Sequence, residues 1–334
     1  MIKLRSWEYW PFGIVQFPAF IYFLWLSLRA RSFVFFSASN PGIPMGGMFG
    51  ESKFDVLRKI PSQYVPTTIL LPNPTTTAEV LHHMTKAGMH FPVILKPDIG
   101  ERGFMVQRVT NEGEVSSYIG QLRCPLIVQE LVDEPLEYGV YYAKYPTEKR
   151  GRVISLVAKE MLSVTGDGES TLKELILNKD RAKLQWKKLS ERFKNELNVV
   201  VEEGKKIELE SIGNHVHGTR FINANNFITD QLSETFDAIS SQIPGFYFGR
   251  FDLRCKTLED LYAGNVKIME LNGCGAEPGH IYDSEYSLWR AFGDVVRHWH
   301  NIYRIARANN KMGVAYLSHR EALAYYKKFR SVIR

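Results

Sequence analysis

The 334-residue chain has few cysteines and no strong excess of charge of either sign. Its cysteines, Cys124, Cys255 and Cys274, are odd in number and far apart, which excludes a disulfide framework and a Cys-x-x-Cys metal knuckle. A reducing compartment that faces the cytosol fits this usage. The formal net charge of +6 is too small to indicate a nucleic-acid partner, and an anionic lipid or a phosphorylated ligand fits it equally well. Hydrophobic residues make up 45% of the chain, enough for compact domains with real cores.

A long apolar run lies near the N-terminus, where residues 9–28 contain no charged side chain. A helix that spans a membrane needs about 20 apolar residues, but this run is interrupted by Pro18 and other polar or helix-breaking residues. Basic residues flank both ends, so the run predicts a monotopic or re-entrant anchor that breaks near Pro18. The alternatives are a helix buried in protein and, less favoured because Arg29 follows directly, a cleaved signal peptide.

The rest of the chain alternates between strand-like and helix-like segments, which predicts an α/β or α+β fold with mixed sheets. Strands are expected at residues 33–36, 93–95, 104–109, 126–130, 136–145, 152–165, 247–254 and 266–271. Helices are expected at residues 51–60, 76–86, 171–197, 258–262, 288–308 and 316–332, and another begins after Asn111.

Two of these strands carry charged side chains on one face each. Side chains alternate between the two faces of a strand, so Arg250, Asp252 and Arg254 share one face. Glu270 and Asn272 share a face of the next strand in the same way. If the strands pair, two carboxylates and an amide oxygen meet, and these hard oxygen ligands suit Mg²⁺ bound to phosphate. The alternative is a solvated strand face held by salt bridges.

Two other segments carry weaker signals for a nucleotide. Lys96 ends a short apolar strand and is followed by the glycine-containing loop Gly100–Gly103, and both features suit phosphate groups. The extended segment at residues 128–132 offers backbone groups to a purine edge, and Glu137 is placed to accept hydrogen bonds from ribose hydroxyls. Taken singly, each segment is also typical of an ordinary hairpin or strand.

In this order along the chain, the segments resemble the ATP-grasp superfamily. The resemblance is to D-alanine–D-alanine ligases and to the ATP-grasp part of cyanophycin synthetase, and it covers residues 51–283. Val164–Leu172 is similar to cyanophycin synthetase and related amide-forming ligases. The resemblance implies two α+β lobes that clasp ATP, and an ATP-dependent ligase that forms a carbon–nitrogen bond.

The resemblance also implies a role for individual residues. Arg250 and Lys96 would be catalytic, and Asp252, Glu270 and Asn272 would bind two Mg²⁺ ions, with Mn²⁺ as an alternative. The implied ATP contacts are Lys53, Lys96, Gly100, Glu101, Arg102, Gly103, Gln129, Glu130, Leu131, Val132 and Glu137. Within this set, Gln129–Val132 would hold adenine and Glu137 the ribose.

Further candidates surround this predicted site. Lys159, on a strand directed at the same cleft, is a candidate for phosphate or for the donor carboxylate. The candidate substrate contacts are His217, Arg220, Asn223, Glu277 and Gly279. We consider a zinc site at His217 less favoured, because it lacks enough further ligands. Cys274 is expected to be a packed thiol rather than a nucleophile.

The ends of the chain depart from the family pattern. Far fewer residues precede Lys53 than a pre-ATP-grasp domain contains, so the region that often helps to bind the donor carboxylate is truncated or replaced. The expected division is an apolar membrane-associating segment at 1–32, a truncated pre-ATP-grasp region at 33–75, the small lobe at 76–135, the large lobe with the magnesium-binding strands at 136–285 and basic helices at 286–334. These last helices alternate Lys and Arg with aromatic residues, which suits an anionic membrane surface or a helical cap with a solvated basic face.

The sequence thus predicts an ATP-dependent carboxylate–amine ligase that works through an acyl phosphate. The expected location is the cytoplasmic face of a membrane, as a peripheral or monotopic protein. Its expected substrates are a small or lipidic carboxylate and an amine, for example an acylated amino acid. The alternatives are an ATP-grasp phosphotransferase and a catalytically silent nucleotide-binding scaffold in a membrane complex. No nucleic-acid partner is expected, and a homodimer remains an open alternative.

Overall fold

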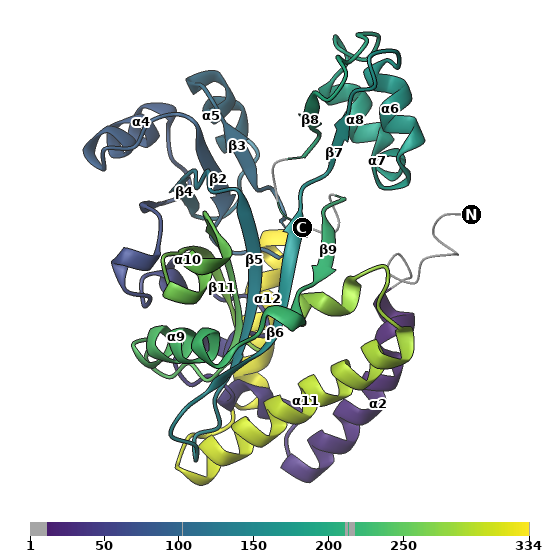
Figure 1. Ribbon diagram of the computed structural model, residues 1–334. Helices are drawn as coiled ribbons and strands as arrows, with labels where there is room; N and C mark the ends of the chain where they lie inside the picture. Colours follow the sequence, from purple (N-terminus) through teal and green to yellow (C-terminus); the bar gives the residue numbers. More distant parts are fainter. Residues whose placement is uncertain (1–11, 102, 211–212, 214–217, 334) are drawn as a thin grey trace.

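The computed structural model describes residues 12–101, 103–210, 213 and 218–333. Two antiparallel sheets, one of four strands and one of five, form the centre of the molecule (Figure 1). Helices cover the outer faces of these sheets, and a small helical unit projects beside them at the upper right of Figure 1. This arrangement of separate antiparallel sheets and helices belongs to the α+β class, and the expectation of mixed sheets is wrong because every strand pair in the described part of the chain is antiparallel.

The smaller sheet has the strand order β1-β4-β2-β3. Its strands are β1 (Thr68–Leu71), β4 (Leu126–Glu130), β2 (Val93–Pro97) and β3 (Gln107–Val109). Helices α4 (Thr77–Lys86) and α5 (Glu112–Ile119) pack on it through buried side chains such as Val80 and Val115. Thr76 caps α4 and Asn111 caps α5, each by accepting the backbone N–H of a glutamate three residues on, as the sequence predicts.

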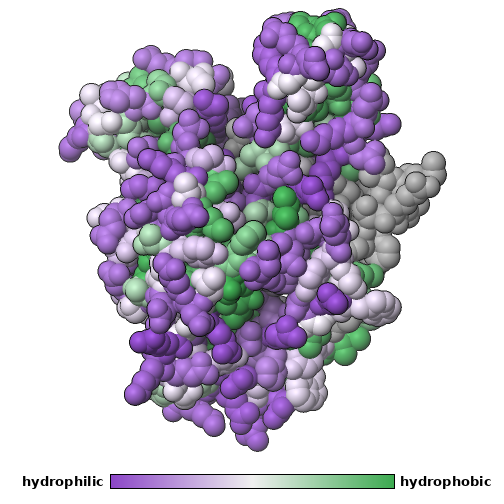
Figure 2. Space-filling view, in the orientation of Figure 1, coloured by the Kyte–Doolittle hydropathy of each residue, from purple (hydrophilic) through white to green (hydrophobic). Residues whose placement is uncertain are grey.

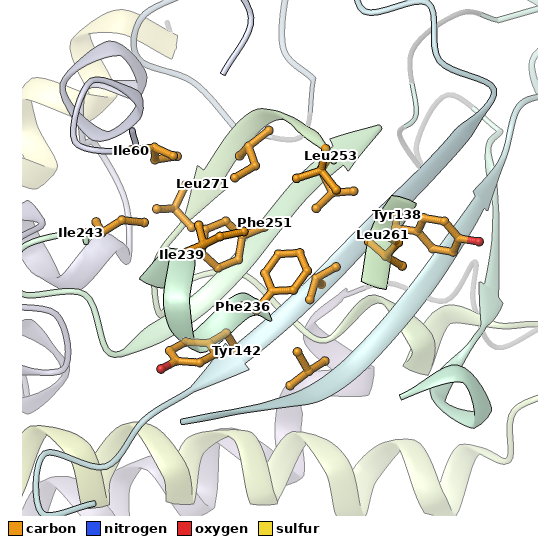
Figure 3. Close-up of a cluster of buried hydrophobic side chains, with 14 of the residues drawn as sticks. Ile60, Tyr138, Tyr142, Phe236, Ile239, Ile243, Phe251, Leu253, Leu261 and Leu271 are labelled. Carbon is orange, nitrogen blue, oxygen red and sulfur yellow. The ribbon is translucent and has the colours of Figure 1, made fainter. Parts of the chain in front are cut away.

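The larger sheet has the strand order β11-β10-β5-β6-β9. Its strands are β11 (Lys267–Asn272), β10 (Phe248–Cys255), β5 (Leu136–Ala143), β6 (Arg152–Glu160) and β9 (Arg220–Asn223). One face packs on α9 (Asp230–Ser241) and α10 (Leu258–Ala263), where Phe251 and Leu253 meet Phe236 in a buried cluster (Figure 3). The alternation along β10 therefore leaves the charged side chains on the opposite face.

A third unit has a core of its own. Strands β7 (Ser163–Thr165) and β8 (Lys206–Glu208) pair, and helices α6 (Leu172–Asn178), α7 (Asp180–Leu184) and α8 (Trp186–Arg192) pack against them. Leu172 and Leu189 are among its buried side chains. In Figure 2 this unit and the small-sheet unit form two projections separated by a notch, above the centre of the larger sheet.

Shorter elements connect these parts. They are η2 (Phe35–Ala38), η3 (Pro44–Gly47), α3 (Lys53–Leu57), η4 (Ser62–Tyr64), η6 (Asn225–Phe227) and η7 (Gly279–Tyr282). The strand predicted at residues 33–36 is wrong, because the chain there enters the 3-10 turn η2. Phe35 and Phe36 are nevertheless buried, so the apolar run signalled burial and not the type of element.

Three long helices complete the fold: α2 (Phe12–Ala30), α11 (Leu288–Lys311) and α12 (His319–Ile333). Helix α2 lies along α11, with Phe23 against Trp299 at a ring distance of 4.9 Å (Figure 1). The predicted break near Pro18 is wrong, because α2 continues through this residue. Packing along α11 compensates for the backbone hydrogen bond that proline cannot donate. No helix among the described residues is both long enough and apolar enough to cross a membrane.

Candidate active site

The predicted pairing of the charged strands is present in the structure. Strands β10 and β11 are antiparallel, and Asp252 lies opposite Glu270 while Arg250 lies opposite Asn272. The neighbouring strand β5 contributes Gly139 directly beside them. A Cβ atom at Gly139 would lie 3.2 Å from Arg250 Cδ and 3.4 Å from Asp252 Oδ1. The absence of a side chain at this position therefore lets both charged groups lie close to β5.

Asp252 is the centre of a buried ion-pair cluster. It accepts hydrogen bonds from Arg250 (Nη2 to Oδ2, 3.0 Å), Lys159 (Nζ to Oδ1, 2.9 Å) and the Asn272 amide (Nδ2 to Oδ2, 2.9 Å). Burial works to raise the pKa of Asp252, but Arg250 and Lys159 outweigh it and lower this pKa to about 2. The carboxylate is therefore charged at neutral pH although its side chain is only 7% exposed.

Glu137 extends this cluster along β5. Its Oε1 accepts from Lys159 Nζ at 3.1 Å, and its Oε2 accepts from Arg254 Nε at 2.9 Å. The resemblance implied a ribose contact for Glu137, but both of its oxygens are engaged by cations and its side chain is 6% exposed. Lys159 likewise bridges Glu137 and Asp252, so these buried residues form one connected network of ion pairs.

Lys53 joins Glu270 from the other side of the site. It is the first residue of α3, and the capping residue Ser52 is itself bonded to Asp98 at 2.9 Å. Lys53 Nζ forms an ion pair with Glu270 Oε1. Burial works to lower the pKa of Lys53, but the contact with Glu270 outweighs it and raises this pKa. Glu270 is the more accessible acid, with 30% of its side chain exposed.

Lys96 approaches the same acids from the smaller sheet. Its Nζ donates to Gln129 Oε1 at 2.9 Å and to the Met269 carbonyl at 3.1 Å. The register of β10 and β11 shifts after Asp252, and this bulge leaves Met269 without a partner residue on β10. Burial lowers the pKa of Lys96 to about 8. A buried lysine with a lowered pKa in such a cluster is a typical feature of a functional site.

The loop predicted to cover phosphates follows β2. Gly100, Glu101 and Gly103 lie there, between β2 and β3, and Arg102 lies outside the described residues. Gly103 has a φ of 71°, a conformation that favours glycine. The loop thus begins at the end of β2, the strand that carries Lys96.

The segment predicted to hold adenine only partly keeps free backbone groups. Gln129 lies in β4 and its side chain binds Lys96, a role that the sequence did not indicate. The Glu130 N–H donates to the Thr67 carbonyl, and the Val132 carbonyl accepts from Arg254 Nη1 at 3.1 Å. Leu131 lies between them, just beyond the end of β4.

The candidate substrate contacts lie on β9 and in, or just before, η7. The Glu277 carbonyl accepts from Arg250 Nη1 at 2.9 Å, and Gly279 begins η7 against Val157. Asn223 lies on β9, where its N–H donates to Asp283, and Arg220 at the start of β9 faces Glu160 and Glu285 at the surface. His217 lies outside the described residues.

A buried polar network behind this loop was missed in the sequence. His280 Nδ1 lies 2.7 Å from Ser155 Oγ, and His280 Nε2 lies 3.0 Å from Asp294 Oδ2. Tyr286 also donates to Asp294 at 2.6 Å. The network joins β6, η7, α11 and the segment between η7 and α11, so no local sequence pattern predicts it. The network ties the loop after β11 to the body of the protein.

The three cysteines are free and buried. Burial raises the pKa of Cys274 to about 12, and the carboxylate of Glu51 contributes to this rise. Cys274 is therefore a packed thiol and not a nucleophile.

The chain is similar in structure to several known proteins. Neither a protein-family model nor a curated protein sequence matches it. Similar solved structures include the VanG D-Ala:D-Ser ligase from Enterococcus faecalis, with a TM-score of 0.41 and 12% identity over 74% of this chain and 61% of that chain. A D-alanine–D-alanine ligase from Bacillus anthracis gives a TM-score of 0.43 and 12% identity over 78% and 69%. A bifunctional glutathione synthetase from Pasteurella multocida gives 0.36 and 14% over 73% and 35%.

Asp252, Glu270, Lys53 and Lys96 come together in the structure, in segments whose order along the chain is the one on which the sequence resemblance rests. The chain resembles the ATP-grasp superfamily. It spans less than two thirds of the length of the VanG ligase and about a third of the glutathione synthetase.

The residues of this site fit magnesium. Two carboxylates and one amide lie on adjacent register positions of β10 and β11, and oxygen ligands of this kind are the ones that Mg²⁺ prefers. No set of three His, Cys, Asp or Glu side chains gathers as a metal site within the described part of the chain, so the amide of Asn272 is needed to complete the set. Lys53 neutralises Glu270 in the structure, and the metal would take over that role.

Proposed function

We propose that the protein is an ATP-dependent carboxylate–amine ligase that works through an acyl phosphate. The observation that carries the proposal is the meeting of two opposed acids, Asp252 and Glu270, with two lysines from different segments, Lys53 and Lys96. Such a cluster suits a triphosphate and its magnesium ions between the two sheets. A phosphorylated carboxylate is then open to attack by an amine.

Each residue of the cluster has a separate task in this proposal. Lys53 and Lys96 bind the phosphate oxygens of ATP, and Asp252, Glu270 and Asn272 hold the magnesium ions. Magnesium neutralises charge on the phosphate that is transferred. Arg250 stabilises charge on the transferring group from beside Asp252. The protein thus contributes mainly position and fixed charges, because ATP itself supplies the leaving group.

The first test is a screen for ADP release with panels of carboxylates and amines. The proposal expects ADP and phosphate to form only when a carboxylate, an amine and Mg²⁺ are all present. A phosphotransferase would release ADP from one acceptor and give a stable phosphorylated product without inorganic phosphate. A silent scaffold would give no turnover, and the variant Asp252→Asn/Glu270→Gln would keep full function in cells.

We further propose that α2 binds the cytoplasmic face of a membrane and that one substrate is lipidic. One side of α2 packs on α11, and the other side exposes a stripe of large apolar side chains. This stripe consists of Phe17, Phe20, Ile21, Leu24 and Leu28. Arg29 and Arg31 are exposed beside it, and no acidic residue occurs between Tyr9 and Gly50. An apolar stripe with cations at its end is typical of helices that lie in an anionic lipid surface.

This location is tested by sedimentation with phosphatidylcholine vesicles that contain or lack phosphatidylserine. The variant Ile21→Asn/Leu28→Asn should lose most vesicle binding, whereas Leu323→Asn, an exposed leucine on α12, should retain it. A wild-type protein that ignores vesicles but forms a dimer disrupted by the α2 variant would contradict the proposal. The stripe would then be an interface between two copies.

A further inference from the structure

One acidic residue close to the site has no role in the proposal so far. Glu51 follows Gly50, which has a φ of 77° and lies against Phe329 of α12. The segment just before them is bonded to the loop after β11, because Cys274 N donates to the Gly46 carbonyl at 3.0 Å. Gly275 N donates to the Gly47 carbonyl at 2.9 Å in the same way. Glu51 is therefore held in place from two sides.

The Glu51 side chain differs from the other acids of the site. Asp252, Glu137 and Glu270 are each ion-paired, but Glu51 Oε2 is buried and has no hydrogen-bond partner among the described residues. Burial raises the pKa of Glu51, and Lys53, Glu101 and Glu270 are the charged groups that act on it. A buried carboxylate oxygen without a partner is costly, so Glu51 Oε2 is suited to accept a hydrogen bond from a ligand.

The charges around Glu51 limit what this ligand is. Glu51, Glu101 and Glu270 outnumber Lys53 among the charged groups around this oxygen, which disfavours a phosphate bound directly to Oε2. The metal ligands Asp252, Glu270 and Asn272 lie on β10 and β11, whereas Glu51 lies on the separate segment that pairs with the loop after β11. A positively charged hydrogen-bond donor fits the position, because it would satisfy Oε2 and balance the surplus acid.

We propose that Glu51 binds the ammonium group of the acceptor substrate, an inference that rests on the proposed ligase function. Glu51 takes one proton from the ammonium, and the freed lone pair attacks the carbonyl carbon of the acyl phosphate. The carbon–nitrogen bond forms, the carbon–oxygen bond to phosphate breaks, and phosphate leaves with that electron pair. The second proton of the nitrogen leaves with the phosphate, so atoms and charge balance.

The test compares Glu51→Gln with Asp55→Asn, a control on the exposed side of α3 whose side chain is 52% exposed. Two nucleophiles are used: the primary amine from the ADP-release screen, and hydroxylamine, which is uncharged at neutral pH and traps acyl phosphates. Glu51→Gln should raise the KM for the primary amine about 100-fold, in line with the loss of a charged hydrogen bond. Hydroxamate formation and the affinity of the ATP complex for Mn²⁺ should stay at wild-type values.

A second test measures the unfolding temperature of the protein without substrate. Glu51→Gln removes an unpaired buried charge, so it should raise the unfolding temperature of the ligand-free protein by about 2 °C. A structural role would lower this temperature instead. An unchanged KM for the amine, or equal losses with amine and hydroxylamine, would overturn the proposal. Absence of ADP and hydroxamate with the wild-type protein would instead overturn the ligase function on which it rests.

Discussion

Replacing Asp252 by asparagine removes one charge from the buried cluster that contains Lys159 and Arg250. The pKa of Asp252 is about 2 in the folded protein and 3.8 in the reference state. This difference corresponds to about 2 kcal/mol of stability at neutral pH. The variant also leaves two buried cations with one acid fewer, and loss of one partner from a buried pair costs about 3–5 kcal/mol. We expect Asp252→Asn to lower the free energy of unfolding by about 3 kcal/mol.

The assay is urea unfolding at pH 7, with Glu234→Gln as the matched control. Glu234 forms an ion pair with Arg150, but both side chains are largely exposed, so this change should cost less than about 1 kcal/mol. The pKa of Asp252 is lower in the folded state, so its contribution is present above pH 4 and is lost as the pH falls toward 2. The difference between wild type and Asp252→Asn should shrink over this range. Equal effects of the two variants at pH 7 would refute the reasoning.

Other predictions follow from single residues of the same site. Burial lowers the pKa of Lys96 to about 8, so Lys96 loses its positive charge above that pH. Affinity for MgATP, measured by calorimetry, should fall about tenfold from pH 7 to 9, and Lys96→Met should abolish this dependence. Gly139→Ala would place a Cβ 2.8 Å from Val157, so urea unfolding should show a loss of about 1–3 kcal/mol. Gly293→Ala on α11 meets no atom within 4 Å and should instead stabilise the protein by about 1 kcal/mol.

Local patterns in the sequence were sufficient for the part of the site built on neighbouring strands. The alternation in β10 and β11 predicts that Asp252 and Glu270 face each other, and the register of the strands agrees. The capping residues Thr76 and Asn111 also mark the starts of their helices correctly. These features depend on a few consecutive residues, so tertiary packing does not change them.

Features that depend on distant segments were not predictable in this way. Gln129 holds Lys96, and Ser155 holds His280, through contacts between elements far apart in the sequence. The lack of a partner for Glu51 Oε2 among the described residues is visible only in the folded protein, because it depends on packing between distant segments. Pro18 was expected to interrupt a helix, but the packing of α2 on α11 overrides this local preference. The domain boundaries and the roles of the site residues stay predictions.

Calorimetric titration with ATP in the presence and absence of Mg²⁺ tests the central claim most directly. The wild-type protein should bind ATP tightly only with Mg²⁺. Without the metal, the carboxylates of Asp252 and Glu270 repel the triphosphate. Glu270→Gln should weaken MgATP binding at least tenfold while the protein remains folded. Equal ATP affinity with and without Mg²⁺, or an unchanged affinity in Glu270→Gln, would contradict the account.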